Sequence, residues 1–500
     1  MPETYKSFIA GKWTDAEGGA SYENRNPADT DDVIGRFPAC GPPDVEKAVA
    51  SAVRGFEEWS RIPAPKRGEV LKKAGDLLTE RKEELADGMT REMGKPLVET
   101  RGDVQEAIDT AYYAASEGRR LFSFTAPSEL RDKAGWAIRR PAGVFGIVTP
   151  WNFPIAVPSW KIFPALVCGN AVVWKPAQDT PWSAVKFVEV LLEAGLPANV
   201  VQLVTGFGSE AGAPLVSHPD VTGVSFTGST EVGCRIAARC GEQGKPVSLE
   251  MGGKNAQIVL DDADVDLAME GVLWGAFGTT GQRCTATSRL ILQDGIHDDF
   301  LSQLVDRARS LRLGDGRKKD TDVGPLISEA AREKVERYID LGQADGADLL
   351  CGGRRPEGRE YEKGHFFEPT IFARVDAGMR IEQEEIFGPV LSVVRVRTPD
   401  EAFRINNGVK YGLSSSIYTR DVTIAFRALN ELDNGITYVN APTIGAEAHL
   451  PFGGVKQTGN GHREGGWEVY EFYSETKVGY LDFSGRLQRA QIDNYPGTPD

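Results

Sequence analysis

The 500-residue sequence predicts an α/β protein built on two doubly wound parallel sheets. Apolar, strand-like runs alternate with amphipathic helical runs between Val144 and Met251, which is typical of such a sheet. A second series of the same kind follows Lys254. The chain is also too long for one hydrophobic core and fits two or three domains of ordinary size.

The first series supplies five expected strands, each followed by a turn or a helix: residues 144–149, 171–175, 200–205, 223–227 and 247–251. The clearest helix covers residues 182–194, where Gly195-Leu196-Pro197 ends it. Ligands of doubly wound sheets bind beyond the carboxyl ends of the strands. We therefore expect chemistry near the side chains at those ends, which are Thr149, Lys175, Thr227 and Glu250.

Residues 45–119, upstream of this series, are rich in charge and alanine and predict an outer layer of helices. The second series predicts strands at residues 289–292, 390–396, 414–418 and 435–439. Two short strand-like stretches, 136–140 and 477–483, belong to neither series. We place one domain at residues 1–122 and 143–252, a second at 253–455, and separate strands at 123–142 and 470–490.

The composition excludes several classes of partner. The formal net charge is −15, whereas a nucleic acid or an anionic membrane calls for clustered lysine and arginine. No run of 18 apolar residues is present, and the N-terminus lacks the basic-then-apolar order of a signal peptide. The six cysteines are scattered, without C-x-x-C or zinc-type histidine spacing. We expect a cytoplasmic protein with free thiols and no metal.

The segment Gly281-Gln282-Arg283-Cys284-Thr285 predicts a reactive thiol. The ionised sulfur is the nucleophile, and a neighbouring cation such as Arg283 lowers the pKa of a thiol. A small buried hydrophobe is the alternative for Cys284. A cysteine hydrolase would need a histidine partner, and none of the five histidines has a recognised pairing with this cysteine.

Three further segments accompany the cysteine: Thr149-Pro150-Trp151-Asn152-Phe153-Pro154, Leu249-Glu250-Met251-Gly252-Gly253-Lys254 and Glu384-Glu385-Ile386-Phe387-Gly388-Pro389. The four segments occur in an order and at separations that resemble the NAD(P)-dependent aldehyde dehydrogenase superfamily. The resemblance covers nearly the whole chain. The resemblance implies an aldehyde dehydrogenase-like fold with an NAD or NADP cofactor. It also implies that 136–140 and 477–483 form a small sheet joining subunits, in a homodimer or homotetramer. Ordinary edge strands are the alternative.

A dinucleotide site is expected where Phe226-Thr227-Gly228-Ser229 ends a strand and begins a helix. Gly228 lets the backbone approach a pyrophosphate, and Ser229 and the free helix amides can donate to it, although a plain helix N-cap is the alternative. The resemblance assigns Lys175 to the adenine ribose, and Glu385 and Phe387 to the nicotinamide half. The other expected cofactor residues are Thr149, Trp151, Gly208, Gly212, Phe226 and Met251.

Gln178 departs from the family pattern, because NAD-preferring members often carry glutamate there. A neutral side chain removes the repulsion of a 2′-phosphate, so we expect NADP to be accepted.

At the reacting centre the resemblance implies that Cys284 attacks the aldehyde while Asn152 and the Cys284 amide bind the oxyanion. Glu250 is the expected general base for hydrolysis of the resulting thioester to a free acid. The alternatives are a tight turn for Asn152 and a satisfied carboxylate for Glu250.

The substrate prediction depends on Arg283, since a fixed guanidinium suits a carboxylate tail. Together with residues 279–287, 445–447 and 459–464, it makes the chain most similar to the branch that oxidises carboxylate-bearing semialdehydes. Phe153 and Trp160 are candidates for the apolar wall of the aldehyde tunnel. Arg283 in a structural ion pair, a neutral aliphatic or aromatic aldehyde as substrate, and a non-catalytic relative remain alternatives.

Overall fold

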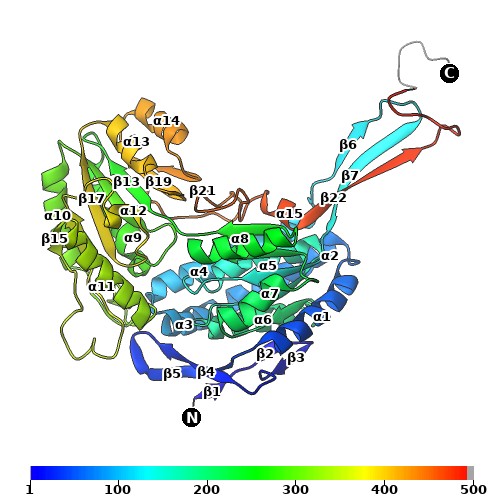
Figure 1. The fold of residues 1–500 in the computed structure, drawn as a ribbon, viewed down its shortest axis with the longest axis horizontal. Coiled ribbons are helices and arrows are strands. Elements are labelled where there is room, and N and C mark those ends of the chain that lie inside the picture. The colour runs from blue at the N-terminus through cyan, green and yellow to red at the C-terminus, as the bar shows by residue number, and fades with distance from the viewer. Residues whose placement is uncertain (1, 493–500) are drawn as a thin grey trace.

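The computed structural model describes residues 2–492 and contains two seven-stranded sheets with helices on their faces (Figure 1). The predicted α/β fold is therefore confirmed. Both sheets are mixed rather than purely parallel, because each has antiparallel pairing at one edge.

In the first sheet, the chain order reverses at strand β8. The strands of this sheet, in spatial order, are β12 (Val247–Glu250), β11 (Gly223–Thr227), β8 (Val144–Val148), β9 (Ala171–Lys175), β10 (Val201–Leu203), β2 (Ser7–Ile9) and β3 (Lys12–Thr14). The five strands from β12 to β10 are parallel, with β8 between β9 and β11. Such a reversal opens a crevice beyond the carboxyl ends of the strands, which is where ligands of these sheets bind.

The five predicted strands of this sheet are present, each within two residues of the expected bounds. Strands β2 and β3 were not predicted. They are only three residues long and join the sheet through Phe8, which pairs with Leu203 almost 200 residues later. That pairing depends on tertiary structure, so local periodicity carries no signal for it.

The second sheet repeats the arrangement around β13. Its strands, in spatial order, are β15 (Asp348–Cys351), β16 (Thr370–Ala373), β17 (Val390–Val396), β14 (Thr287–Gln293), β13 (Asn255–Val259), β19 (Ser414–Tyr418) and β20 (Ile436–Val439). Four of these were predicted, whereas β13, β15 and β16 were not. All five residues of β13 are buried, so it lacks the alternation that marks a half-exposed strand.

Helices cover both sheets and supply most of the buried apolar side chains. The predicted outer layer consists of α1 (Pro42–Trp59), α2 (Ala64–Glu80), α3 (Lys82–Met93) and α4 (Leu97–Glu117). The first sheet also carries α5 (Ala156–Cys168), α6 (Pro181–Glu193), the π-helical turn η1 (Gly208–Gly212), α7 (Ala213–Ser217) and α8 (Thr230–Glu242). The remaining helices are α9 (Val265–Phe277), η2 (Gly278–Gly281), α10 (His297–Arg309), α11 (Glu329–Ala344), α12 (Arg380–Gln383), α13 (Pro399–Asn407), α14 (Val422–Glu431) and α15 (Val469–Phe472).

Three small sheets complete the fold. They contain β1 (Glu3–Thr4), β4 (Ser21–Asn26) and β5 (Asp29–Pro38); β18 (Tyr411–Gly412) and β21 (Val455–Lys456); and β6 (Phe124–Pro127), β7 (Lys133–Pro141) and β22 (Ser474–Asp482). The last sheet contains the two predicted strand-like stretches, 136–140 and 477–483. They pair with each other in β7 and β22, where Val478 lies opposite Ala137.

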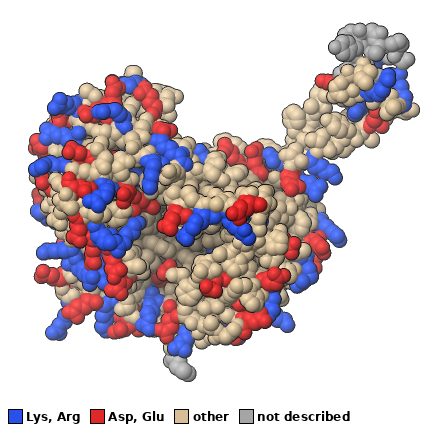
Figure 2. All heavy atoms as spheres, viewed as in Figure 1, with Lys and Arg blue, Asp and Glu red and all other residues tan. Residues whose placement is uncertain are grey.

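The β6–β7–β22 sheet projects from the body as an arm (Figure 1). Much of its length shows few charged side chains (Figure 2). The arm leaves large apolar side chains exposed, namely Phe124, Trp136, Ile138, Val478, Tyr480 and Leu481. No helix in residues 2–492 is long and apolar enough to cross a membrane.

Candidate active site

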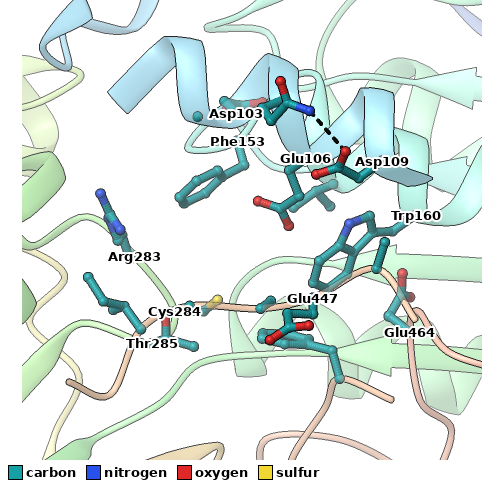
Figure 3. Close-up of a pocket in the computed structure, with 18 of the residues that line it drawn as sticks. Asp103, Glu106, Asp109, Phe153, Trp160, Arg283, Cys284, Thr285, Glu447 and Glu464 are labelled. Atoms are coloured by element: carbon teal, nitrogen blue, oxygen red, sulfur yellow. Dashed lines mark hydrogen bonds between the residues drawn. The ribbon is translucent and has the colours of Figure 1, made fainter. Parts of the chain in front are cut away.

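Cys284 opens into a cavity of about 640 Å³ where segments from the whole chain meet (Figure 3). Helix α4 and the segment around Phe153 form one side, and the cysteine segment and the loop 444–452 form the other. Glu250 and Trp160 also line the cavity. The structure thus brings Cys284, Glu250, Arg283, Phe153 and Trp160 to one place, as the sequence analysis expected.

The cysteine segment is held by a strained backbone and close contacts. Thr279 and Thr280 adopt left-handed conformations with φ of 52° and 58°, which are costly for residues with a side chain. Gly281 also has a positive φ, and a Cβ there would overlap the Gly388 carbonyl. The Asn255 side-chain amide donates to the Cys284 carbonyl at 2.7 Å. This backbone therefore fixes where the sulfur lies.

The expected effect of Arg283 on the thiol is not found. The pKa of Cys284 is raised to about 12, first by burial and then by the charges of Glu250, Glu385 and Glu106, while a hydrogen bond from the Thr285 backbone acts in the opposite direction. The side chain is half-buried because its open surface faces the cavity. Burial in a site with several carboxylates disfavours the thiolate, so the prediction of a lowered thiol pKa was wrong.

The guanidinium of Arg283 is engaged elsewhere. It forms an ion pair of 3.2 Å with Glu99 and donates to the Thr279 hydroxyl at 2.7 Å. Its Cζ also lies 4.8 Å from the centre of the Trp274 ring. The structural ion pair that the sequence left open for Arg283 is therefore present, although the residue still lines the cavity.

Asn152 lies beside the cysteine segment. Its side-chain amide donates to the backbone carbonyl of Gln282 at 3.1 Å, and its backbone carbonyl accepts from the Lys95 ammonium group at 3.0 Å. Lys95 is completely buried and pairs with Asp103 at 2.7 Å. The side chain thus reaches across to the segment of Cys284, 130 residues later, so a purely local turn does not describe it.

Glu250 is a buried carboxyl group with no hydrogen-bond partner for either oxygen among the described residues. Burial raises its pKa well above the ordinary range and Glu464 raises it further, while Lys161 and Arg463 act in the opposite direction. The alternative of a satisfied carboxylate is thereby excluded. A buried, unpaired carboxyl with a raised pKa is typical of a functional group.

A buried ion pair behind Glu250 was missed by the sequence analysis. Lys161 pairs with Glu464, 303 residues later, and donates to the Ser225 hydroxyl at 3.0 Å. Lys161 follows Trp160 in the apolar helix α5, where an isolated lysine is itself an unusual feature. That anomaly was the available signal, but its partner could not be read from the sequence.

The carboxyl edge of the first sheet holds the residues expected at the adenine end of a dinucleotide. Lys175 is buried, and burial lowers its pKa to about 8. A Cβ on Gly212 would lie 3.6 Å from the Lys175 side chain, and the Thr149 amide donates to the Lys175 carbonyl at 3.3 Å. Gly208, at the start of the same π-helical turn, is exposed.

Gln178 is exposed, and its neighbour Asp179 was overlooked. Burial raises the pKa of Asp179, whereas Lys175 lowers it, so this carboxyl lies within electrostatic reach of the Lys175 ammonium group.

The glycine turn between β11 and α8 is present as predicted. A Cβ on Gly228 would overlap the Phe226 ring, and one on Gly233 would overlap the Met251 sulfur, so a larger residue at either position would require these side chains to shift. Phe226 and Met251 are buried and pack together beneath the turn. Ser229 caps α8 by accepting from the Val232 amide, which is the N-cap alternative. The turn still exposes backbone amides that suit a phosphate.

The expected nicotinamide residues also lie together. The carboxylate of Glu385 accepts from the Gly253 amide at 2.9 Å, and a Cβ on Gly252 would overlap it. Burial raises the pKa of Glu385. Phe387 has a φ of 62° and packs edge-on against Trp151, with ring centres 5.6 Å apart. The structure therefore places a buried carboxyl group and an aromatic ring in the segment expected at the nicotinamide.

Helix α4 contributes acidic side chains that the sequence analysis did not single out. Glu99, Asp103 and Glu106 line the cavity at spacings of four and three residues, which places them on one helix face. This spacing could have identified an acidic helix face from the sequence. The sequence does not show that this face points into the cavity.

Comparison with known proteins agrees with this geometry. The Aldehyde dehydrogenase family matches residues 13–478. An alpha-ketoglutaric semialdehyde dehydrogenase of Bacillus subtilis (strain 168) is 42% identical over 96% of this chain and 98% of its own length. An NADP(+) succinate-semialdehyde dehydrogenase of Escherichia coli (strain K12) is 38% identical over 94% and 96%.

Solved structures give the same result for the fold. The betaine aldehyde dehydrogenase of Staphylococcus aureus in complex with NAD+ superimposes with a TM-score of 0.94 at 35% identity, covering 97% of this chain and 96% of that one. The chain therefore belongs to the aldehyde dehydrogenase family, and the predicted enzyme class, an NAD(P)-dependent aldehyde dehydrogenase, is confirmed.

Proposed function

We propose that this enzyme oxidises an aldehyde bearing a carboxylate to the free acid, with Cys284 as nucleophile. The observation that carries the proposal is that Cys284 and Glu250, which has no hydrogen-bond partner among the described residues, line one cavity, while the Asn152 amide bonds to the cysteine segment at Gln282. The three groups supply a nucleophile, an oxyanion donor and a base, which acyl chemistry on an aldehyde requires.

In the first stage, Cys284 loses its proton and its sulfur bonds to the aldehyde carbon. Because the pKa of this thiol is about 12, the thiol form dominates at neutral pH and the proton needs an acceptor. Cys284 lines the open cavity, so solvent water can accept this proton. The Asn152 amide and the Cys284 backbone amide bind the oxygen that becomes negative.

When bound, NAD(P)+ supplies the hydride acceptor. Lys175 would hold the adenine ribose, the Gly228 turn the pyrophosphate, and Glu385 and Phe387 the nicotinamide riboside. Loss of hydride leaves a thioester on Cys284, and Glu250 then takes a proton from the water that cleaves it. Since neither Glu250 oxygen has a hydrogen-bond partner within residues 2–492, the carboxyl group can meet that water.

For the cofactor, we propose that NADP is accepted. Support comes from the neutral, exposed Gln178 and from Lys175, a cationic donor at the strand end. Asp179 acts against a 2′-phosphate when ionised, but burial raises its pKa and reduces that effect.

For the substrate, we propose a semialdehyde with an acidic tail. Arg283 lines the cavity, and the relatives described above include enzymes named for such semialdehydes. Phe153 and Trp160 would form the apolar wall, since both line the cavity and Trp160 packs edge-on against Phe452 at 4.8 Å.

We also propose a cytoplasmic homodimer or homotetramer. All six cysteines are free thiols, which suits a reducing compartment. The apolar side chains on the arm would become buried if the β6–β7–β22 sheet joined subunits.

The test is a matrix of two cofactors and matched aldehydes, scored by kcat/KM. Succinic semialdehyde and butanal have equal chain lengths and differ in the terminal carboxylate. We expect the acid to be preferred by at least about tenfold, since each tenfold preference corresponds to about 1.4 kcal/mol. We also expect Cys284→Ala to abolish oxidation of both. Equal values for acidic and neutral aldehydes would refute the substrate proposal, and residual oxidation by Cys284→Ala would refute the nucleophile.

A further inference from the structure

Glu106 is the cavity carboxyl that the mechanism does not use. It projects from α4 toward the space above Cys284 (Figure 3). Within residues 2–492 its carboxyl group makes no hydrogen bond and no ion pair. Apart from Glu250, the other carboxylates lining the cavity have partners: Glu99 with Arg283, Asp103 with Lys95, Asp109 with Gln105, Glu447 with His449, and Glu464 with Lys161. Glu106 is therefore available to a ligand.

The surroundings of Glu106 favour its uncharged form. Burial raises its pKa to about 8, although part of the side chain faces the cavity. Asp103 and Asp109 on the same helix raise this pKa further, while Lys95 and Arg283 from other segments lower it. Across the cavity, Cys284 and Tyr438 experience its charge, and Glu447 is the other nearby acid. At neutral pH most molecules therefore carry a protonated Glu106, which can donate a hydrogen bond.

Arg283 alone does not supply all the hydrogen-bond donors that an acidic tail needs. Its Nε donates to Thr279 and one terminal nitrogen donates to Glu99, so two of the three guanidinium nitrogens are occupied. A carboxylate bound in a cavity requires donors for both of its oxygens, because an unpaired buried oxygen is costly. A second donor must come from another wall. Glu106 is an acid of α4 that lines the cavity and has no hydrogen bond or ion pair among the described residues.

We propose that Glu106 is a specificity-determining residue that donates its carboxyl hydrogen to an oxygen of the substrate's acidic tail. This inference rests on the proposed function, and it adds a pH-dependent discrimination between aldehydes. Once Glu106 ionises, it repels the tail that it held, and it has no corresponding effect on a neutral aldehyde.

The experiment measures the ratio of kcat/KM for succinic semialdehyde to that for butanal between pH 6 and pH 9.5. Both substrates use the same Cys284 and Glu250, so the ionisation of those groups cancels in the ratio. With a Glu106 pKa of about 8, the ratio for the wild type should fall about tenfold from pH 7 to pH 9.

Three variants separate the roles. Glu106→Gln keeps a donor that does not titrate, so its ratio should stay high and flat with pH. Glu106→Leu removes the donor, so its ratio should be low and flat. Asp109→Asn is the matched control, because Asp109 lies one turn further along the same helix and already accepts from Gln105 at 2.9 Å. Its ratio should still fall with pH, at a somewhat lower pH than in the wild type, because Asp109 no longer raises the pKa of Glu106.

Failure of this inference differs from failure of the proposed function. A wild-type ratio near one at all pH values would refute the proposal that the substrate carries an acidic tail. A high ratio that titrates equally in Glu106→Gln would keep the substrate and overturn the role of Glu106. A preference for 4-aminobutanal over butanal that disappears in Glu106→Gln would also overturn it, since Glu106 would then act as an anion.

Discussion

Replacing Glu250 with glutamine should separate the two halves of the reaction. The substitution keeps the shape of the side chain and removes its ability to accept a proton. Attack by Cys284 and loss of hydride would still produce one thioester per active site. Water activation would fail, and loss of a general base typically costs about 100- to 10,000-fold in rate. We therefore expect a rapid burst of NAD(P)H followed by turnover slowed to that extent.

The same substitution should stabilise the fold at neutral pH. Burial raises the pKa of Glu250 above its value in the unfolded chain, so the folded protein binds this proton more tightly. Folding stability is then lost as pH rises from the ordinary glutamate range through the raised pKa. Glu250→Gln removes this loss, so its thermal midpoint should exceed that of the wild type at pH 8 and match it near pH 4.

The assay is stopped-flow absorbance of NAD(P)H with substrate in excess over enzyme, combined with thermal unfolding at the two pH values. In the wild type, the rate of thioester hydrolysis should increase with pH until Glu250 is ionised. That increase should be missing in the variant.

Glu92→Gln is a matched control for this experiment. Glu92 is also a buried carboxyl, and burial raises its pKa to about 8, but it accepts hydrogen bonds from Trp182 and Ser183 at the start of α6. It lies outside the cavity, so its replacement should produce no burst. Unchanged steady-state turnover in Glu250→Gln would refute the assignment of Glu250 as the base. A burst in Glu92→Gln would show that the burst is not specific to the loss of Glu250.

Three further substitutions test other parts of the site. Asn152→Ala should lower kcat by about 100- to 1,000-fold by removing an oxyanion donor, and a change confined to KM would contradict that role. Gln178→Glu should reduce the NADP-to-NAD ratio of kcat/KM by about tenfold or more through repulsion of the 2′-phosphate, whereas an unchanged ratio would show that position 178 does not face the ribose. Lys95→Met leaves the fully buried Asp103 without its ion pair and should lower the free energy of unfolding by about 3–5 kcal/mol in urea titrations; a loss below about 1 kcal/mol would indicate that the pair does not stabilise the fold.

The amino-acid sequence by itself determined the features that depend on neighbours in the chain. Short apolar runs located β8, β9 and β11, and the turn at Gly228 follows from a strand, a glycine and a capping serine in succession. The four motifs were sufficient for the family. Strands β13 and β2 were missed for opposite reasons, since one is buried on both faces and the other is three residues long.

Only the tertiary structure decided the chemical state of the site. Arg283 is adjacent to Cys284 in the chain, yet its guanidinium pairs with Glu99, 184 residues earlier. The pKa of Cys284 therefore follows from burial and from distant carboxylates rather than from its neighbour. The physical reason is that desolvation and Coulomb interactions depend on distance in space, and α4 reaches the cysteine segment only when the two sheets and their helices have packed.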